Sequence, residues 1–184
     1  YPGGESTCKV DFITVQRQKT TSFVDYYKAD SLGVVWIDAF GTVRSLDNEG
    51  NLIVHTTGRR PLQLDITRHK ISVLTCFKAP ELALYRRGEK DPARTISLQP
   101  GPNMEPTTLC SDERYTVVCY KNLKKKSQTD PGPWFEIQLF SNKKMGLARL
   151  DVFKIHNPEK RVVDLPFIAR LAKCGKILKS SSPL

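Results

Sequence analysis

Residues Gly33 to Phe77 read GVVWIDAFGTVRSLDNEGNLIVHTTGRRPLQLDITRHKISVLTCF, and this stretch decides the fold class. Runs rich in Val, Ile, Leu and Thr, each of strand length, follow one another at 34–38, 42–46, 51–57, 62–66 and 70–77. Turn sequences separate them, as at Asp47 to Gly50 and at Gly58 to Pro61. Short β-rich runs joined by hairpin-length turns are typical of an antiparallel meander.

The run at 62–66 shows the alternation of a strand with two different faces. Its apolar positions are Leu62, Leu64 and Ile66, and polar residues stand between them. Because successive side chains of a strand point to opposite faces, we expect one face to pack on a core and the other to face water.

Outside this stretch the pattern predicts further strands at 10–15, 21–27, 115–121, 134–140 and 147–155. A short helix is predicted from Pro80 to Gly88, with helix formers inside and Gly at its end. A second helix is predicted to begin at Asp164 as N-cap. Between Glu89 and Asp112 four prolines interrupt the pattern, which predicts a linker or long loop.

These elements predict an α+β fold that is mostly antiparallel β, made of two modules in tandem, each a β-sheet packed with a helix. The first module spans residues 1–90, the proline-rich linker spans 91–112, and the second module spans 113–184.

Chain length and cysteine content indicate the size of the core and the compartment of the protein. A chain of 184 residues and 20.8 kDa can bury a sizeable core. It starts at Tyr1 without Met or a signal-peptide core, so we expect a piece of a longer protein. Its 5 cysteines are scattered and include no C-x-x-C pair, which favours reduced thiols inside the cell.

Motifs for catalysis are missing from the sequence. It contains no Walker A motif, no G-x-G-x-x-G, no H-E-x-x-H and no G-x-S-x-G. Its 3 histidines and 5 cysteines have no metal-ligand spacing. We therefore expect no enzyme activity in this chain and no cofactor or metal.

Charge is distributed unevenly along the chain. Residues 1–56 hold five Lys and Arg against seven Asp and Glu, for a net −2, whereas residues 57–184 hold 24 against 12, for a net +12. Such an excess indicates an anionic partner. The basic residues at strand ends and hairpins predict the contact set Arg59, Arg60, Arg68, Lys70, Lys121, Lys124, Lys125 and Lys126.

Three interpretations of these cations remain open. An Asp- and Glu-rich peptide fits the charge and can also pair along a sheet edge. Nucleic acid is the alternative, although the aromatic residues do not interleave with the lysines as on a base-stacking surface. In the third reading the charges only keep the surface soluble.

Two segments carry a resemblance to a known family. The runs VVWIDAFGTVRS (34–45) and LQLDITRHKISVLT (62–75) resemble the opening strands of the cryptic polo box region of centriole-duplication kinases of the polo-like kinase 4 group. The run YTVVCYKNLKKKSQTDPGPWFEIQLFSNKKMGLARLDVFKIH (115–156) resembles the second box of that region. The likeness covers most of residues 33–179.

The resemblance implies two tandem polo boxes, a homodimer and a non-catalytic role within a serine/threonine-protein kinase, that is, a transferase of the cell cycle. It also implies targeting to the centriole or centrosome, where a basic patch binds an acidic segment of a scaffold protein and supports centriole duplication. The N-terminal extension, the proline-rich joint and the short final helix depart from the pattern, which indicates a divergent member.

Overall fold

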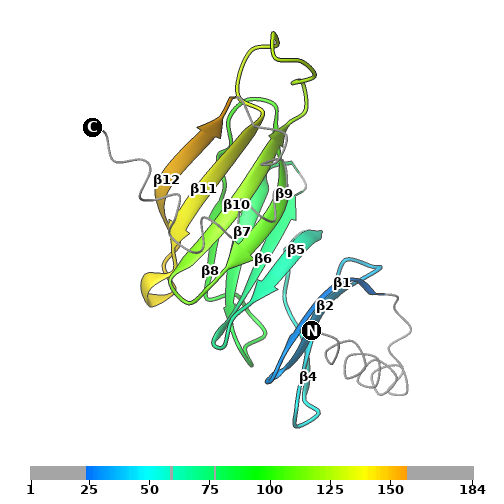
Figure 1. Cartoon of the computed structure of the whole chain (residues 1–184). Helices are drawn as coiled ribbons and strands as arrows, with labels where there is room; N and C mark the ends of the chain where they lie inside the picture. Colours follow the sequence, from blue (N-terminus) through cyan, green and yellow to red (C-terminus); the bar gives the residue numbers. More distant parts are fainter. Residues whose placement is uncertain (1–23, 59, 77, 157–184) are drawn as a thin grey trace.

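The structure, a computed structural model, describes residues 24–58, 60–76 and 78–156, which form three antiparallel sheets (Figure 1). The first sheet contains β1 (Val24–Asp30), β2 (Gly33–Asp38), β3 (Val43–Asp47) and β4 (Leu52–Val54). The second contains β5 (Pro61–Ile66), β6 (Lys70–Cys76), β7 (Pro80–Arg86) and β8 (Arg94–Ser97). The third contains β9 (Met104–Ser111), β10 (Tyr115–Asn122), β11 (Phe135–Ser141) and β12 (Ala148–Ile155), with a short 3-10 turn at Lys143–Met145.

Each sheet is a meander, because strands that follow one another in sequence are also neighbours in the sheet. The sheets contact one another through their first strands: β5 lies against β1 and β2 on one side and against β9 on the other. Four-stranded meanders that repeat side by side in this way are the blades of a β-propeller. The described residues therefore have the architecture of three consecutive propeller blades.

Two apolar cores lie between the sheets. The core between the second and third sheets contains Leu82, Leu84, Val118, Tyr120 and Phe140. The core between the first and second sheets contains Val35, Val43, Ile71, Val73 and Tyr85. The second sheet thus buries both of its faces, which removes most of its surface from water and stabilises the stack.

The helix predicted from Pro80 to Gly88 is wrong, because Pro80–Arg86 forms β7. Its side chains alternate between the two cores: Leu82 and Leu84 face the third sheet, and Ala83 and Tyr85 face the first. A strand that is buried on both faces has a continuous apolar run rather than an alternating one. A short run of this kind has no periodicity that separates it from a helix.

The proline-rich segment is not a loop. It contains β8 and the whole of β9, and β9 pairs with β10 along its length. Pro106 is buried within β9 at a β-bulge next to Tyr120, a position that a strand can give to proline. Among the described residues, three sheets replace the two sheet-and-helix modules that were predicted, and no helix packs on them. The helix predicted from Asp164 and the strand at 10–15 lie outside the described residues.

The strands predicted between residues 33 and 77 are present, but they belong to two different sheets and not to one meander. The runs at 34–38, 42–46 and 51–57 contribute β2, β3 and a shorter β4 to the first sheet, whereas those at 62–66 and 70–77 begin the second. The strand predicted at 21–27 is β1, which runs farther, to Asp30. The strands predicted at 115–121, 134–140 and 147–155 are confirmed as β10, β11 and β12.

The polar face of β5 does not meet water as expected. Gln63 donates from Nε2 to the carbonyl of Thr107 at 2.6 Å and accepts from the amide of Leu109 at 2.9 Å. The carboxylate of Asp65, which is buried, accepts from the amide of Ser111 at 2.6 Å. These side chains form hydrogen bonds with main-chain groups of β9. The polar positions of β5 therefore face the third sheet and not solvent.

Candidate functional site

The loops of the sheets gather at two opposite ends, here called end I and end II. End I holds the turns β1–β2, β3–β4, β5–β6, β7–β8, β9–β10 and β11–β12, and end II holds the turns β2–β3, β6–β7 and β10–β11 with the starts of β5 and β9. Contacts between sheets fix this assignment: Arg87 pairs with Asp30 at end I, and a β-carbon at Gly41 would lie 3.4 Å from Cγ of Arg60 at end II.

The predicted contact residues divide between these ends. Arg68 in turn β5–β6 and Lys70 at the start of β6 lie at end I, whereas the other described members of the set lie at end II. Those members are Arg60, Lys121, Lys124, Lys125 and Lys126. Arg59 lies outside the described residues. The predicted set therefore does not form one rim.

Two of the predicted lysines have structural roles. Lys70 is buried, and its Nζ donates to the carbonyl of Glu113 at 2.6 Å, which ties turn β5–β6 to turn β9–β10. Lys125 is also buried: its Nζ donates to the carbonyls of Gln128 and Asp130 and lies 5.6 Å from the centre of the Trp134 ring. Ammonium groups held in this way are not available to a partner.

End II nevertheless concentrates exposed cations. Its exposed basic side chains are Arg60, Lys78, Lys121, Lys124, Lys126 and Lys154. Lys78 and Lys154 were not in the predicted set, because Lys78 stands alone in the sequence and Lys154 lies within the predicted strand at 147–155. Among the described side chains at this end, the carboxylate of Glu105 is exposed and those of Glu81 and Asp130 are partly exposed. Glu105 stands opposite Lys121 across β9 and β10.

The β10–β11 loop is the most basic part of end II, and it projects beyond the sheets (Figure 1). Internal bonds hold it in place: the carboxylate of Asp130 accepts from the amides of Lys126 and Ser127 at 2.6 and 2.7 Å. These bonds to Lys126 and Ser127 lower the pKa of Asp130, so it stays ionised. Lys125 is folded inward, and its neighbours Lys124 and Lys126 are exposed on either side.

Removal of the Lys125 ammonium should loosen this loop. We expect Lys125→Ala to lower the free energy of unfolding by about 2 kcal/mol, since bonds to a charged donor are among the stronger ones. The matched change Lys124→Ala removes an exposed side chain and should cost less than about 0.5 kcal/mol. Urea denaturation of the two variants measures the difference. Equal losses of unfolding free energy would mean that Lys125 does not stabilise the loop.

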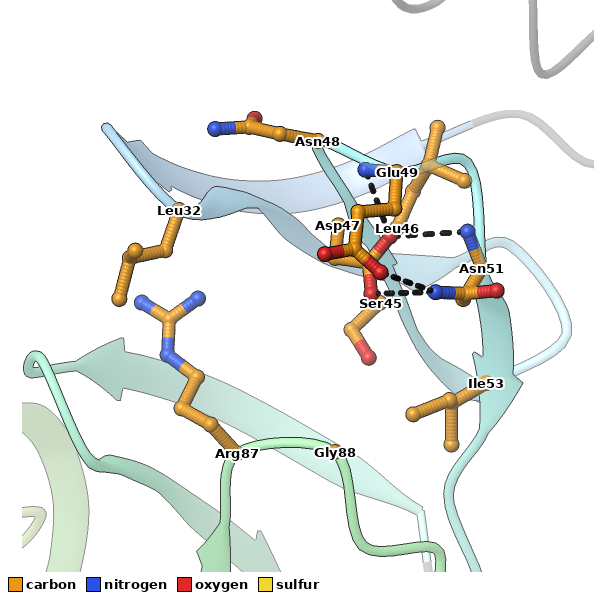
Figure 2. A pocket seen from close by; sticks show the side chains of 10 residues that line it. All are labelled: Leu32, Ser45, Leu46, Asp47, Asn48, Glu49, Asn51, Ile53, Arg87 and Gly88. Atoms are coloured by element: carbon orange, nitrogen blue, oxygen red, sulfur yellow. Dashed lines mark hydrogen bonds between the residues drawn. The ribbon is translucent and has the colours of Figure 1, made fainter.

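A hollow of about 420 Å³ lies at end I between turns β3–β4 and β7–β8 (Figure 2). Leu32, Leu46 and Ile53 contribute its apolar walls. Its polar groups serve the fold: Asp47 accepts from the amides of Glu49 and Asn51, and Arg87 donates to the carbonyl of Thr67 and contacts Asp30. The hollow therefore offers little unused bonding capacity to a ligand.

Ser45 lines this hollow and bonds to a buried histidine. The Oγ of Ser45 lies 2.8 Å from Nε2 of His55, and the ring packs edge-on against Tyr85. Burial lowers the pKa of His55, and the main chain of Glu89 opposes that shift only in part. Nδ1 of His55 has no hydrogen-bond partner in ordinary geometry. Without a group that orients the ring, the pair lacks the arrangement of a serine nucleophile and its base.

His55 should instead make stability depend on pH. Because its folded pKa lies below the unfolded value, the unfolded chain takes up a proton first as pH falls, so stability should decrease from pH 7 toward pH 5. We expect His55→Gln to flatten this dependence and His69→Gln, an exposed control, to leave it unchanged. Chemical denaturation at several pH values measures it, and an unchanged slope in His55→Gln would show that His55 does not cause the loss.

Within the described residues, no group of three or more His, Cys, Asp or Glu is arranged to hold a metal ion. That part of the chain also contains no helix long and apolar enough to cross a membrane. Burial raises the pKa of Cys119 to about 12, so this thiol remains protonated and unreactive at neutral pH.

Comparison with known proteins does not assign the chain to a family. No family model and no curated protein matches the chain. A solved structure of S. cerevisiae Dbp5 bound to Nup159, Gle1, IP6 and ADP matches 70% of this chain and 36% of that chain, at 14% identity and TM-score 0.48. The crystal structure of the N-terminal domain of Nup159 matches 78% of this chain and 33% of that chain, at 15% identity and TM-score 0.45.

This chain therefore spans about a third of the length of these two solved chains. At such identities and TM-scores the similarity assigns neither a partner nor an activity to it.

Proposed function

We propose that this chain is a non-catalytic protein-binding domain whose end II binds an acidic segment of another protein. The proposal rests mainly on the excess of exposed cations at end II, where Arg60, Lys78, Lys121, Lys124, Lys126 and Lys154 outnumber the described carboxylates Glu81, Glu105 and Asp130. An excess of one sign attracts an oppositely charged segment and speeds its encounter. The sheets and the internally bonded β10–β11 loop fix the backbone that carries these cations, so the partner meets a partly preorganised surface.

Contacts connect the cations into one path. Turn β2–β3 lies beside Arg60 at the start of β5. Gln63 of β5 bonds to β9, and Glu105 of β9 stands opposite Lys121 in the register of β9 and β10. The path then continues into the β10–β11 loop, where Lys124 and Lys126 are exposed. An extended peptide can therefore follow the cations from the first sheet to the third.

Titration with labelled synthetic peptides tests this proposal. We expect a peptide of mixed Asp and Glu to bind at low salt and to weaken steadily as salt rises, because screening shortens the range of exposed charges. A peptide of the same length with Asn and Gln in place of Asp and Glu is the control and should not bind. Failure of the acidic peptide to bind at low salt would refute the proposal.

The same titration, carried out with oligonucleotides, tests nucleic acid as the alternative partner. Single-stranded and duplex oligonucleotides should bind more weakly than the acidic peptide if end II recognises protein. Tight oligonucleotide binding with a steep, linear dependence of log K on log salt would instead favour nucleic acid.

The polo-like kinase resemblance suggests a narrower form of this proposal, with a kinase as the parent chain, a centriolar scaffold as the partner and a homodimer as the working state. The helix that it adds to each sheet is not found among the described residues. Sedimentation equilibrium of the chain tests the dimer, and co-localisation of a tagged chain with centrioles tests the targeting. A monomer that does not localise there would remove this narrower form.

A further inference from the structure

The cationic path of end II also carries exposed apolar side chains. Phe40 in turn β2–β3 is 81% exposed, Leu62 in β5 is 40% exposed, and Leu123 after β10 is 59% exposed. Each stands close in sequence or space to a cation: Phe40 precedes Gly41, which lies beside Arg60, Leu62 follows Arg60 by two positions, and Leu123 precedes Lys124.

The turn that presents Phe40 is fixed by a buried carboxylate. Asp38 accepts from the amides of Phe40 and Thr42 at 3.0 and 2.9 Å and from Nε of Arg44 at 2.9 Å. Burial tends to raise the pKa of Asp38, but its bonds to Thr42, Arg44 and Phe40 outweigh burial and lower the pKa. The carboxylate is thus ionised and fully bonded, so the exposed Phe40 sits on an ordered turn and not on a frayed loop.

An exposed aromatic side chain on an ordered turn is an unusual feature of a protein surface. Aromatic and Arg side chains are enriched in protein interfaces, and buried aromatic anchors carry much of the binding energy there. Purely acidic segments would leave this apolar area in water. A partner that covers both kinds of side chain must itself combine acidic and apolar residues.

We propose that the segment bound at end II is an amphipathic acidic peptide, with apolar side chains that pack on Phe40 and Leu62 and Asp or Glu residues that meet Lys121, Lys124 and Lys126. This inference rests on the proposed function and specifies the chemistry of its partner. The apolar part of the peptide lies at the first sheet, and the acidic part extends along β9 and β10 to the β10–β11 loop.

The shape of end II favours a peptide over an anionic bilayer. The β10–β11 loop projects well beyond turn β2–β3 of the first sheet (Figure 1). A flat membrane would therefore meet the β10–β11 loop first, whereas an extended chain can also reach turn β2–β3. The apolar side chains are also separated by cations along the path rather than joined in one patch.

Two peptides and two variants test this inference by fluorescence anisotropy. One peptide carries Leu and Phe at one end followed by Asp and Glu, and the other carries Ser in place of Leu and Phe. We expect the first to bind the unaltered protein about tenfold more tightly, and Phe40→Ala to abolish that advantage while it leaves affinity for the second peptide unchanged. The control Leu150→Ala removes a comparably exposed apolar side chain from β12 and should change neither affinity.

The outcomes separate this inference from the proposed function. If both peptides bind equally and with the same salt dependence, the acidic-segment proposal stands and the apolar contact is wrong. If neither peptide binds, the proposed function fails as well. Binding of the protein to phosphatidylserine vesicles without binding to either peptide would overturn the inference in favour of a membrane. Thermal denaturation of Phe40→Ala should match the unaltered protein, since the side chain is exposed.

Discussion

Leu84→Ala and Tyr85→Ala should each lower the free energy of unfolding by about 3 kcal/mol or more. These neighbours in β7 point to opposite faces of the second sheet, with Leu84 in the core toward the third sheet and Tyr85 in the core toward the first. Both side chains are essentially unexposed, so each truncation leaves a cavity. Tyr85→Ala also removes the bond from its hydroxyl to the carbonyl of Thr56 at 2.8 Å.

Urea denaturation measures both losses, with Leu150→Ala as the control. Leu150 lies on β12 and is 53% exposed, so its truncation should cost less than about 0.5 kcal/mol. A large loss for Leu84→Ala with almost none for Tyr85→Ala would mean that the first sheet does not pack on the second. That result would contradict the arrangement of three adjoining blades.

Reversal of four cations at end II should nearly abolish the binding of an acidic peptide. The changes Arg60→Glu, Lys121→Glu, Lys124→Glu and Lys126→Glu alter exposed side chains, so they should leave the fold intact. An exposed ion pair contributes about 0.5 kcal/mol, and reversal turns attraction into repulsion. Four positions then change the binding free energy by about 4 kcal/mol, or several hundredfold in Kd at low salt.

A matched reversal at end I separates local binding from net charge. Arg68→Glu, Lys90→Glu, Arg114→Glu and Lys143→Glu alter four exposed cations, so the variant has the same net charge as the end II variant. We expect it to lose about tenfold or less, because its charges are distant from the bound segment and screened by salt. Equal losses in the two variants would mean that total charge, not end II, attracts the peptide.

The strands were predictable where the residue pattern fits a strand and does not fit a helix or a loop. The runs that became β2, β3, β5 and β6 are rich in β-branched residues and lie between clear turns, and the Pro-Gly turn before Trp134 identified β11. β7 was missed because Leu82, Ala83 and Leu84 are as suitable for a helix as for a doubly buried strand. β9 was missed because Pro106 suggests a break, and the bulge that accommodates it forms only beside β10.

The sequence predicted that the candidate site is basic, but it did not predict which residues are exposed there. Lysines 124 to 126 are consecutive and look equivalent in the sequence, yet Lys125 is buried against Trp134 while its neighbours are exposed. The sequence places Phe40 in the turn between the runs at 34–38 and 42–46, and the structure adds that its side chain is 81% exposed on a turn fixed by Asp38. Nothing in the local pattern distinguishes Lys125 from its two neighbours.

The sequence alone determined that this chain is rich in antiparallel β-structure, that its turns lie at Gly and Pro, and that its second half is basic, because backbone propensity and net charge are properties of local residues. The tertiary structure decided which strands share a sheet, why polar side chains of β5 are buried against β9, and which cations remain in water. Those outcomes depend on partners far away along the chain, and a one-dimensional pattern does not record which partner covers a given face.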